Sequence, residues 1–301
     1  MADFFHLKSI AELHRLFGLE KPLHPLITVI REWPEIDFDF GNTKMVSDLY
    51  VLGMKGNVSG TFKYGRNSYD YEEGTLVFMA PNQVAQFDDA DAELDRNGWN
   101  IFFHPDLIRK SVLGKTIKDS SFFNYGLNEA LHVSNKEKYM LTDFVQRIET
   151  ELHQNIDKHS QELILVNLES ILKYCYRYYD RQFYTRTNLN KDFIVRFEHY
   201  LGEYFASEDL MNKGIPNVTE CGKALNMSGS YLSDLLKLET GRSAKDHIHS
   251  YIIEKAKTLL LNSNSPISEV SYYLGFEYSQ HFSKLFKLKT GISPSEYRNM
   301  N

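Results

Sequence analysis

The chain has 301 residues, of which 42% are hydrophobic and 25% are charged, and its formal net charge is −6. This composition is typical of a globular protein and excludes a disordered or fibrous one, and the length accommodates two domains. No segment approaches the length of a membrane-spanning helix, and the first residues lack the apolar run of a signal peptide. Cys175 and Cys221 each lie in an apolar helical pattern, so we expect buried thiols, a cytoplasmic protein and no membrane partner.

The N-terminal part predicts one short helix followed by a β-rich region. Ser9 and Glu12 have the spacing of a capping box, and apolar residues at helical spacing continue to Gly18. Short segments rich in Val, Ile, Phe and Tyr follow, namely LITVI, SDLYVLGM, GTFKYG, YDYEEGTLVFM and GWNIFF. Short strands at such close spacing predict an antiparallel barrel or jelly roll. Glu73 and Gly74, which lead into TLVFMAPNQV, resemble the central hairpin of cupin-type folds.

The predicted barrel lacks the ligand set of a metal-dependent cupin. Such a centre needs imidazole and carboxylate ligands that converge, as a His-x-His pair with a Glu and a later His. GTFKYGRNSYDY contains no His, and Val84 and Gln86 stand where a later ligand would be sought. His24 and His104 each precede a proline singly, which favours structural roles. We therefore expect no metal, no cofactor and no catalytic residue, and the sequence does not single out an effector pocket.

Two longer helical patterns follow the β-rich region. The first opens with the capping-box pair Ser134 and Glu137, and the second opens at Ser160. In the second, apolar residues spaced 4, 3, 4, 3 form a heptad-like seam of Ile164, Leu168, Ile171, Cys175 and Tyr178. Two heptads are too few to decide between a dimer contact and packing on the barrel. The polar, aperiodic stretch at 184–190 then predicts a linker, and a new amphipathic helix follows it.

An internal repeat marks the last part of the chain. LSDLLKLETGRS and FSKLFKLKTGIS match at an offset of fifty residues, and upstream of them the offset is forty-nine. The second copy therefore has one extra residue between Leu274 and Phe282, which we assign to a turn. Gly241 and Gly291 stand where helices end in a left-handed residue. Each copy thus predicts a short helix, a turn and a second helix.

The second helix of each copy has one apolar and one polar face. The apolar residues have the spacing i, i+3, i+4 and are Leu232, Leu235 and Leu236 in one copy and Phe282, Leu285 and Phe286 in the other. This is the helix-turn-helix plan, in which the second helix enters the DNA major groove. An ordinary pair of helical hairpins would not explain why the polar face is duplicated too. We expect base contacts from Ser230, Ser233, Asp234, Ser279, Gln280, Ser283 and Lys284, and phosphate contacts from Lys237 and Lys287.

The segment LGFEYSQHFSKLFKLKTGISPSEYR at 274–298 resembles the end of the second motif in AraC/XylS-type transcription regulators. The shared features are Gly275-Phe276, the spacing of Phe282 and Phe286, Thr290-Gly291 and the Ser-Pro-x-x-Tyr-Arg ending. This resemblance implies a double helix-turn-helix domain at the C-terminus and a cupin-like domain before it. One departure is Ile252, which stands four residues before Ala256 where the family often has arginine.

These observations predict an α+β protein of two domains. We expect a cupin-like sensor barrel at 1–120, a helical dimerisation segment at 121–184, a linker at 185–190 and an all-α DNA-binding domain at 191–301. The resemblance favours the seam as a dimer contact. Residues 212–301 contain eleven Lys and Arg against eight Asp and Glu, so the predicted DNA-binding end is basic and the rest is acidic.

The predicted function is sequence-specific transcription regulation. The expected partners are a double-stranded DNA operator, a second copy of the chain in a homodimer, RNA polymerase if the protein is an activator, and a small-molecule effector. A cupin-type enzyme with an appended helical domain is the alternative, but it requires convergent His and Glu ligands. A non-specific architectural DNA-binding protein would require a larger basic excess.

Overall fold

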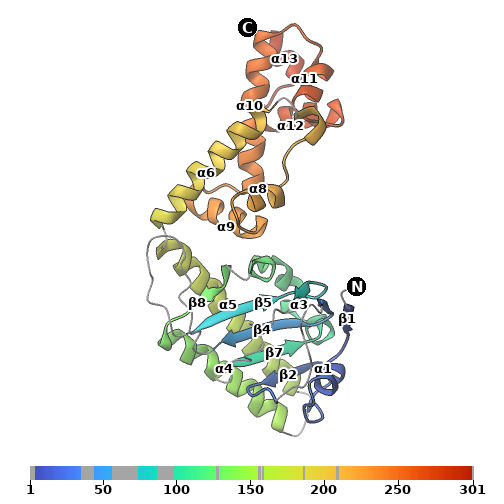
Figure 1. Ribbon diagram of the computed structural model, residues 1–301, viewed down its shortest axis with the longest axis vertical. Coiled ribbons are helices and arrows are strands. Elements are labelled where there is room, and N and C mark those ends of the chain that lie inside the picture. Colours follow the sequence, from blue (N-terminus) through green and yellow to red (C-terminus); the bar gives the residue numbers. More distant parts are fainter. Residues whose placement is uncertain are drawn as a thin grey trace. The chain divides into compact units, whose positions relative to one another are not determined.

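The computed structural model describes residues 4–34, 44–55, 74–86, 98–126, 129–154, 157, 159–185, 187–207 and 210–299. The chain forms two compact units, Met1–Tyr184 and Thr185–Asn301 (Figure 1). The first unit is mixed α+β and the second is helical. None of the described helices combines the length and the apolar character that crossing a membrane requires.

The N-terminal unit contains two small sheets. The strands are β1 (Phe4–Leu7), β2 (Ile27–Ile30), β3 (Lys44–Ser47), β4 (Tyr50–Lys55), β5 (Thr75–Met79), β6 (Val84–Gln86), β7 (Trp99–Phe103) and β8 (Leu131–His132). One sheet has the order β1-β3-β6 and the other the order β2-β7-β4-β5-β8, as Figure 1 shows for the larger sheet. All pairs are antiparallel except β1 with β3. Apart from the β1–β3 pair, the described strands form an antiparallel β-sheet region, and they do not close into the barrel expected from the sequence, because they pair as two separate sheets.

Alternation of side chains explains the central strands. In β5, Leu76 and Phe78 are buried and their neighbours are half-buried, as expected for a strand with one face on the core. Trp99 and Ile101 of β7 are buried in the same way. The predicted strands LITVI, SDLYVLGM and GWNIFF are confirmed as β2, β4 and β7, and the TLVFM part of YDYEEGTLVFM is confirmed as β5. The predicted strand GTFKYG and the start of YDYEEGTLVFM lie outside the described residues.

Helices surround the larger sheet. They are α1 (Ile10–Leu16), α2 (Pro105–Ile108), α3 (Val112–Thr116), two 3₁₀ turns at Ile117–Asp119 and Ser121–Asn124, α4 (Asn135–His153) and α5 (Ser160–Thr185). Trp99 Nε1 donates to Thr142 Oγ1 at 3.1 Å, which ties β7 to α4. Tyr179 of α5 stacks on Phe122 at 5.6 Å between ring centroids. Helix α5 therefore packs on its own unit through an aromatic cluster.

The heptad-like seam of α5 faces the interior of the chain. Its five side chains, Ile164, Leu168, Ile171, Cys175 and Tyr178, are between 0 and 7% exposed. They are buried by the chain itself, so packing within the chain accounts for their spacing. A second copy of the chain would have to dock on other residues. Burial also raises the pKa of the Cys175 thiol far above its usual range.

The two histidines that precede prolines have structural roles, as predicted. His24 Nδ1 accepts a hydrogen bond from the Leu26 backbone N–H at 3.1 Å. His104 is the N-cap of α2, and its Nδ1 accepts from the Asp106 N–H at 3.2 Å. Each ring therefore stabilises the local backbone.

The C-terminal unit consists of helices. They are α6 (Thr187–Ala206), α7 (Leu210–Lys213), α8 (Val218–Ala224), α9 (Gly229–Thr240), α10 (Ala244–Asn262), α11 (Ile267–Tyr273), α12 (Ser279–Thr290) and α13 (Pro294–Asn299). Because α6 begins at Thr187, most of the stretch expected as a linker is helical. Helix α10 contacts α9 of the first pair and α11, α12 and α13. It therefore joins two helical pairs, α8 with α9 and α11 with α12.

Candidate nucleic-acid interface

The two helical pairs are copies of one helix-turn-helix arrangement. Residues 225–228 join α8 to α9, and residues 274–278 join α11 to α12. The first helix of each copy has seven residues and the second has twelve. The extra residue of the second copy lies in its turn, which confirms the position predicted from the change of offset.

Local capping signals set the ends of α9 and α12. Ser228 Oγ accepts from the Tyr231 N–H at 3.1 Å and caps the start of α9. Gly241 and Gly291 end α9 and α12 with φ of 73° and 85°, a conformation in which a side chain would be strained. These predicted ends are confirmed. Helix α12 differs at its start, because its N-cap Tyr278 provides no side-chain hydrogen bond.

The predicted apolar faces form the core of each motif. In α9, Leu232, Leu235 and Leu236 are all 0% exposed. In α12, Phe282 and Phe286 are 0% exposed, and their ring centroids lie 5.7 Å apart. The prediction is wrong only for Leu285, which is half-buried. Phenylalanine rings occupy the interior of the second motif, where the first motif has leucines.

The predicted base-contacting residues occupy equivalent positions on α9 and α12. The fifty-residue offset pairs Ser230 with Gln280 and Asp234 with Lys284. Gln280 and Lys284 are exposed, whereas the other predicted readers are half-buried, namely Ser230, Ser233, Asp234, Ser279 and Ser283. The second motif therefore presents the longer and more accessible polar side chains.

The two motifs differ at the serine that faces the next helix. Ser233 Oγ accepts a long hydrogen bond of 3.4 Å from the backbone N–H of Ala244, the first residue of α10. The fifty-residue offset pairs Ser233 with Ser283 and Ala244 with Pro294, the first residue of α13, which has no N–H to donate. The bond that Ser233 makes with the start of the next helix therefore has no counterpart at Ser283.

Lys237 and Lys287 occupy the last turns of α9 and α12, and both are exposed. Lys237 and Ser230 lie near opposite ends of α9, and Lys287 and Gln280 lie near opposite ends of α12. Lysine at this position adds a flexible positive charge beside the polar face.

Exposed tyrosine residues on α11 and at the start of α12 were missed by the sequence analysis. Tyr272, Tyr273 and Tyr278 are 45, 50 and 54% exposed. The ring centroids of Tyr278 and His281 lie 5.4 Å apart. The neighbouring Glu277 carboxylate raises the pKa of the Tyr278 hydroxyl. The sequence did contain a signal for them, because these tyrosines do not have the helical spacing of the buried residues.

The long helix α10 has no ionic group at the position where the resembling family often has arginine. Ile252 is 0% exposed and belongs to the core. Arg298 of α13 donates instead from Nε to the backbone oxygen of Leu260, near the end of α10, at 3.2 Å. This cation beside the last carbonyls stabilises the C-terminal end of the helix.

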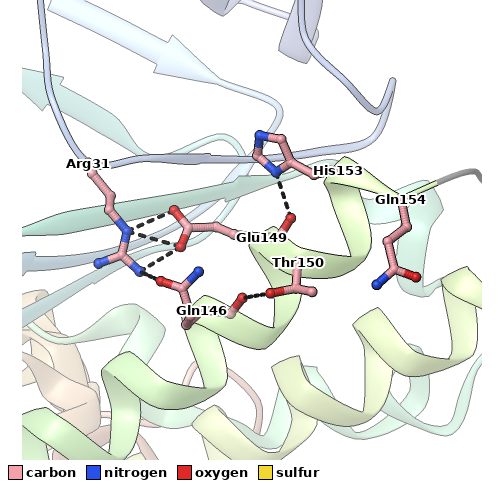
Figure 2. A pocket seen from close by; sticks show the side chains of 6 residues that line it. All are labelled: Arg31, Gln146, Glu149, Thr150, His153 and Gln154. Atoms are coloured by element: carbon pink, nitrogen blue, oxygen red, sulfur yellow. Dashed lines mark hydrogen bonds and ion pairs between the residues drawn. The ribbon is translucent and has the colours of Figure 1, made fainter.

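A polar groove of about 530 Å³ lies in the N-terminal unit (Figure 2). Arg31 binds both carboxylate oxygens of Glu149, with Nη2 2.6 Å from Oε2 and Nε 2.8 Å from Oε1. Glu149 raises the pKa of the Arg31 guanidinium. The Thr150 hydroxyl and His153 Nδ1 bond to backbone oxygens of α4. These groups bind one another, so the groove is a structural tie between β2 and α4.

Comparison with known proteins agrees with the geometry of the C-terminal unit. Residues 221–300 match the family model described as a helix-turn-helix domain. The Msm operon regulatory protein of Streptococcus mutans is 25% identical over 263 residues, which cover 87% of each chain. The xylose operon regulatory protein of Escherichia coli strain K12 is 29% identical over 150 residues, or 50% of this chain and 35% of that protein. Residues 221–300 therefore form the helix-turn-helix domain of an AraC/XylS-type transcription regulator.

Another relative matches a shorter part of the chain. The raffinose operon regulatory protein RafR of Pediococcus pentosaceus is 38% identical over 74 residues, which cover 25% of this chain and 27% of that protein. The chain spans about a third of the length of the xylose regulators. These relatives are named as operon regulators, and the alternative of a cupin-type enzyme is not proposed.

Proposed function

We propose that this AraC/XylS-type regulator binds a double-stranded operator through α9 and α12 and controls the transcription of genes for carbohydrate use. The observation that carries the proposal is the duplication of a buried face and a polar face at equivalent positions of two helix-turn-helix motifs. Two of the relatives are named as regulators of the xylose and raffinose operons, which supports the choice of carbohydrate genes.

Base readout follows from the chemistry of the polar faces. Gln280 can pair with adenine N6 and N7, and Lys284 can donate to guanine O6 and N7. At the position equivalent to Lys284, Asp234 can only accept, which suits cytosine N4. The two motifs therefore read different base pairs, and we expect an operator whose two segments are not repeats of each other. The hydroxyl groups of the serines on both faces can also contact bases, and their side chains are shorter than those of Gln280 and Lys284.

Phosphate contacts position the two helices. Lys237 and Lys287 supply the positive charges at the ends of α9 and α12. The first helix of a helix-turn-helix motif crosses the DNA backbone, and the exposed hydroxyls of Tyr272 and Tyr273 on α11 are suited to donate to phosphate oxygens. This use of neutral donors is consistent with the modest basic excess of the C-terminal unit.

The N-terminal unit is proposed as the sensor and dimerisation unit, with a cupin-like fold. The antiparallel pairing throughout its five-stranded sheet supports that fold. The effector is proposed to be a small carbohydrate, by analogy with the operons of the relatives. The homodimer forms through residues other than the buried α5 seam, and an activator would also contact RNA polymerase. The buried, unpaired thiols of Cys175 and Cys221 suit the cytoplasm.

Replacing Gln280 with alanine should relax base preference at one or two base pairs of the operator. The loss of one bidentate pair corresponds to roughly 1–3 kcal/mol of discrimination. Selection of bound sequences from a randomised operator library, followed by binding titrations, measures this change.

Lys287→Ala is the matched control, because it removes an exposed polar residue from the same helix as Gln280, and Lys237→Ala is its counterpart on α9. Both should weaken binding to all sequences alike, and each should lower the salt slope by about one, because each removes one phosphate partner. An unchanged base preference in Gln280→Ala, or an altered base preference in Lys287→Ala with an unchanged salt slope, would contradict the assignment.

A further inference from the structure

An ion pair joins the two motifs. Lys289 Nζ, in the last turn of α12, lies 2.9 Å from Asp246 Oδ1, in the first turn of α10. The other carboxylate oxygen of Asp246 accepts from the hydroxyl of Ser243, the N-cap of α10, at 2.7 Å. Ser243 comes two residues after Gly241, which ends α9. The pair thus links the end of one reading helix to the end of the other.

The equivalent residue in the second motif behaves differently. The fifty-residue offset pairs Asp246 with Glu296, and Glu296 Oε2 accepts from the backbone N–H of its own N-cap, Ser293, at 2.7 Å. Aspartate is one methylene shorter, and Asp246 instead accepts from the Ser243 hydroxyl and from Lys289. The substitution of Asp for Glu therefore leaves a carboxylate oxygen available for the other motif.

Lys289 also has no equivalent in the first motif, where Glu239 stands at that position. Lys287 and Lys289 are two residues apart, so their side chains leave α12 about 200° apart around the helix axis. Lys287 is exposed beside the polar face, whereas Lys289 reaches α10. Lys289 holds the pKa of Asp246 at about 2, so the carboxylate is charged at neutral pH.

We propose that the Asp246–Lys289 pair sets the spacing of the two DNA segments that the protein reads. A contact between the ends of α9 and α12 restricts the distance and rotation between them. The two residues are positioning residues and touch no base. This inference rests on the proposed function, because it assumes that both helices enter DNA.

The test measures binding as the distance between the two operator segments changes. The wild-type protein is titrated against operators with the preferred spacing and with one base pair removed or added. The discrimination is the ratio of the affinities for the preferred spacing and for an altered spacing. Lys289→Met and Asp246→Asn should each reduce this ratio by up to about fivefold, which corresponds to the usual contribution of an exposed ion pair. Lys289→Arg should retain the discrimination, because it keeps the cation. Thermal unfolding checks that each variant is folded.

Lys287→Met is the matched control, since it removes a lysine from the same helix. It should weaken binding at every spacing equally and lower the salt slope by about one. If Lys289→Met gives that same result, or if Asp246→Asn leaves the discrimination unchanged, the positioning role is overturned. If the wild-type protein shows no sequence-specific binding at any spacing, the proposed function itself fails.

Discussion

Replacing Phe286 with alanine is expected to destabilise the C-terminal unit by about 3–5 kcal/mol, the usual cost of removing a buried aromatic ring. Phe286 is 0% exposed, and its ring contacts the rings of Phe282 at 5.7 Å and Tyr297 at 5.5 Å. Removing the ring would leave a cavity and would remove contacts that hold α12 to the core of its own motif and to α13. Since domains have a total stability of about 5–15 kcal/mol, we also expect DNA binding by the second motif to be abolished.

Leu288→Ala is the control for this prediction. Leu288 lies on the same helix but is 77% exposed, so its truncation should change stability by less than about 0.5 kcal/mol. Urea unfolding of the full chain, followed by far-UV circular dichroism, measures both variants. Equal destabilisation by Phe286→Ala and Leu288→Ala would show that the core of the second motif is not formed by the phenylalanine rings.

Replacing Gly222 with alanine is expected to destabilise the first motif by about 1–3 kcal/mol, the usual cost of overpacking. A Cβ on Gly222 would lie 2.7 Å from the backbone oxygen of Met227 and 2.8 Å from the backbone nitrogen of Gly229. Both atoms belong to the backbone that runs from the turn into α9, so neither can move without shifting that helix. The displaced helix should bind its DNA segment more weakly.

The second motif offers the matched control, because Ser271 occupies the position of Gly222 and its turn is one residue longer. The Ser271 hydroxyl is buried and has no hydrogen-bond partner among the described residues. Ser271→Ala should therefore be neutral or slightly stabilising. Chemical unfolding distinguishes the two variants. A Gly222→Ala protein as stable as the wild type would mean that the turn of the first motif is not in close contact with α8.

Local patterns predicted much of the C-terminal unit because its signals are close together in sequence. Ser228, Gly241 and Gly291 act on backbone groups within a few residues, so their roles can be read without knowledge of the tertiary structure. Because the two copies repeat each other, the helices of the second copy could be predicted from those of the first. The half-burial of Leu285 was not predictable, because it depends on how the rings of the second motif fill their core.

Long-range contacts were not predictable from spacing. The parallel pairing of β1 with β3 joins residues about forty positions apart, and no short-range signal marked β1 as a strand. The α5 seam illustrates the same limit, since its 4, 3, 4, 3 spacing fits a dimer contact and an internal contact equally well. The Asp246–Lys289 pair likewise depends on how α10 and α12 pack, which the repeat alone does not determine.

The central claim is that α9 and α12 enter the DNA together and read separate segments. Hydroxyl-radical footprinting of the wild-type protein on an operator selected from a random library tests it most directly. Two helices joined by the stiff α10 should protect two segments about one helical turn, roughly 10 base pairs, apart on the same face of the DNA. A single protected segment, or two segments on opposite faces, would contradict the account.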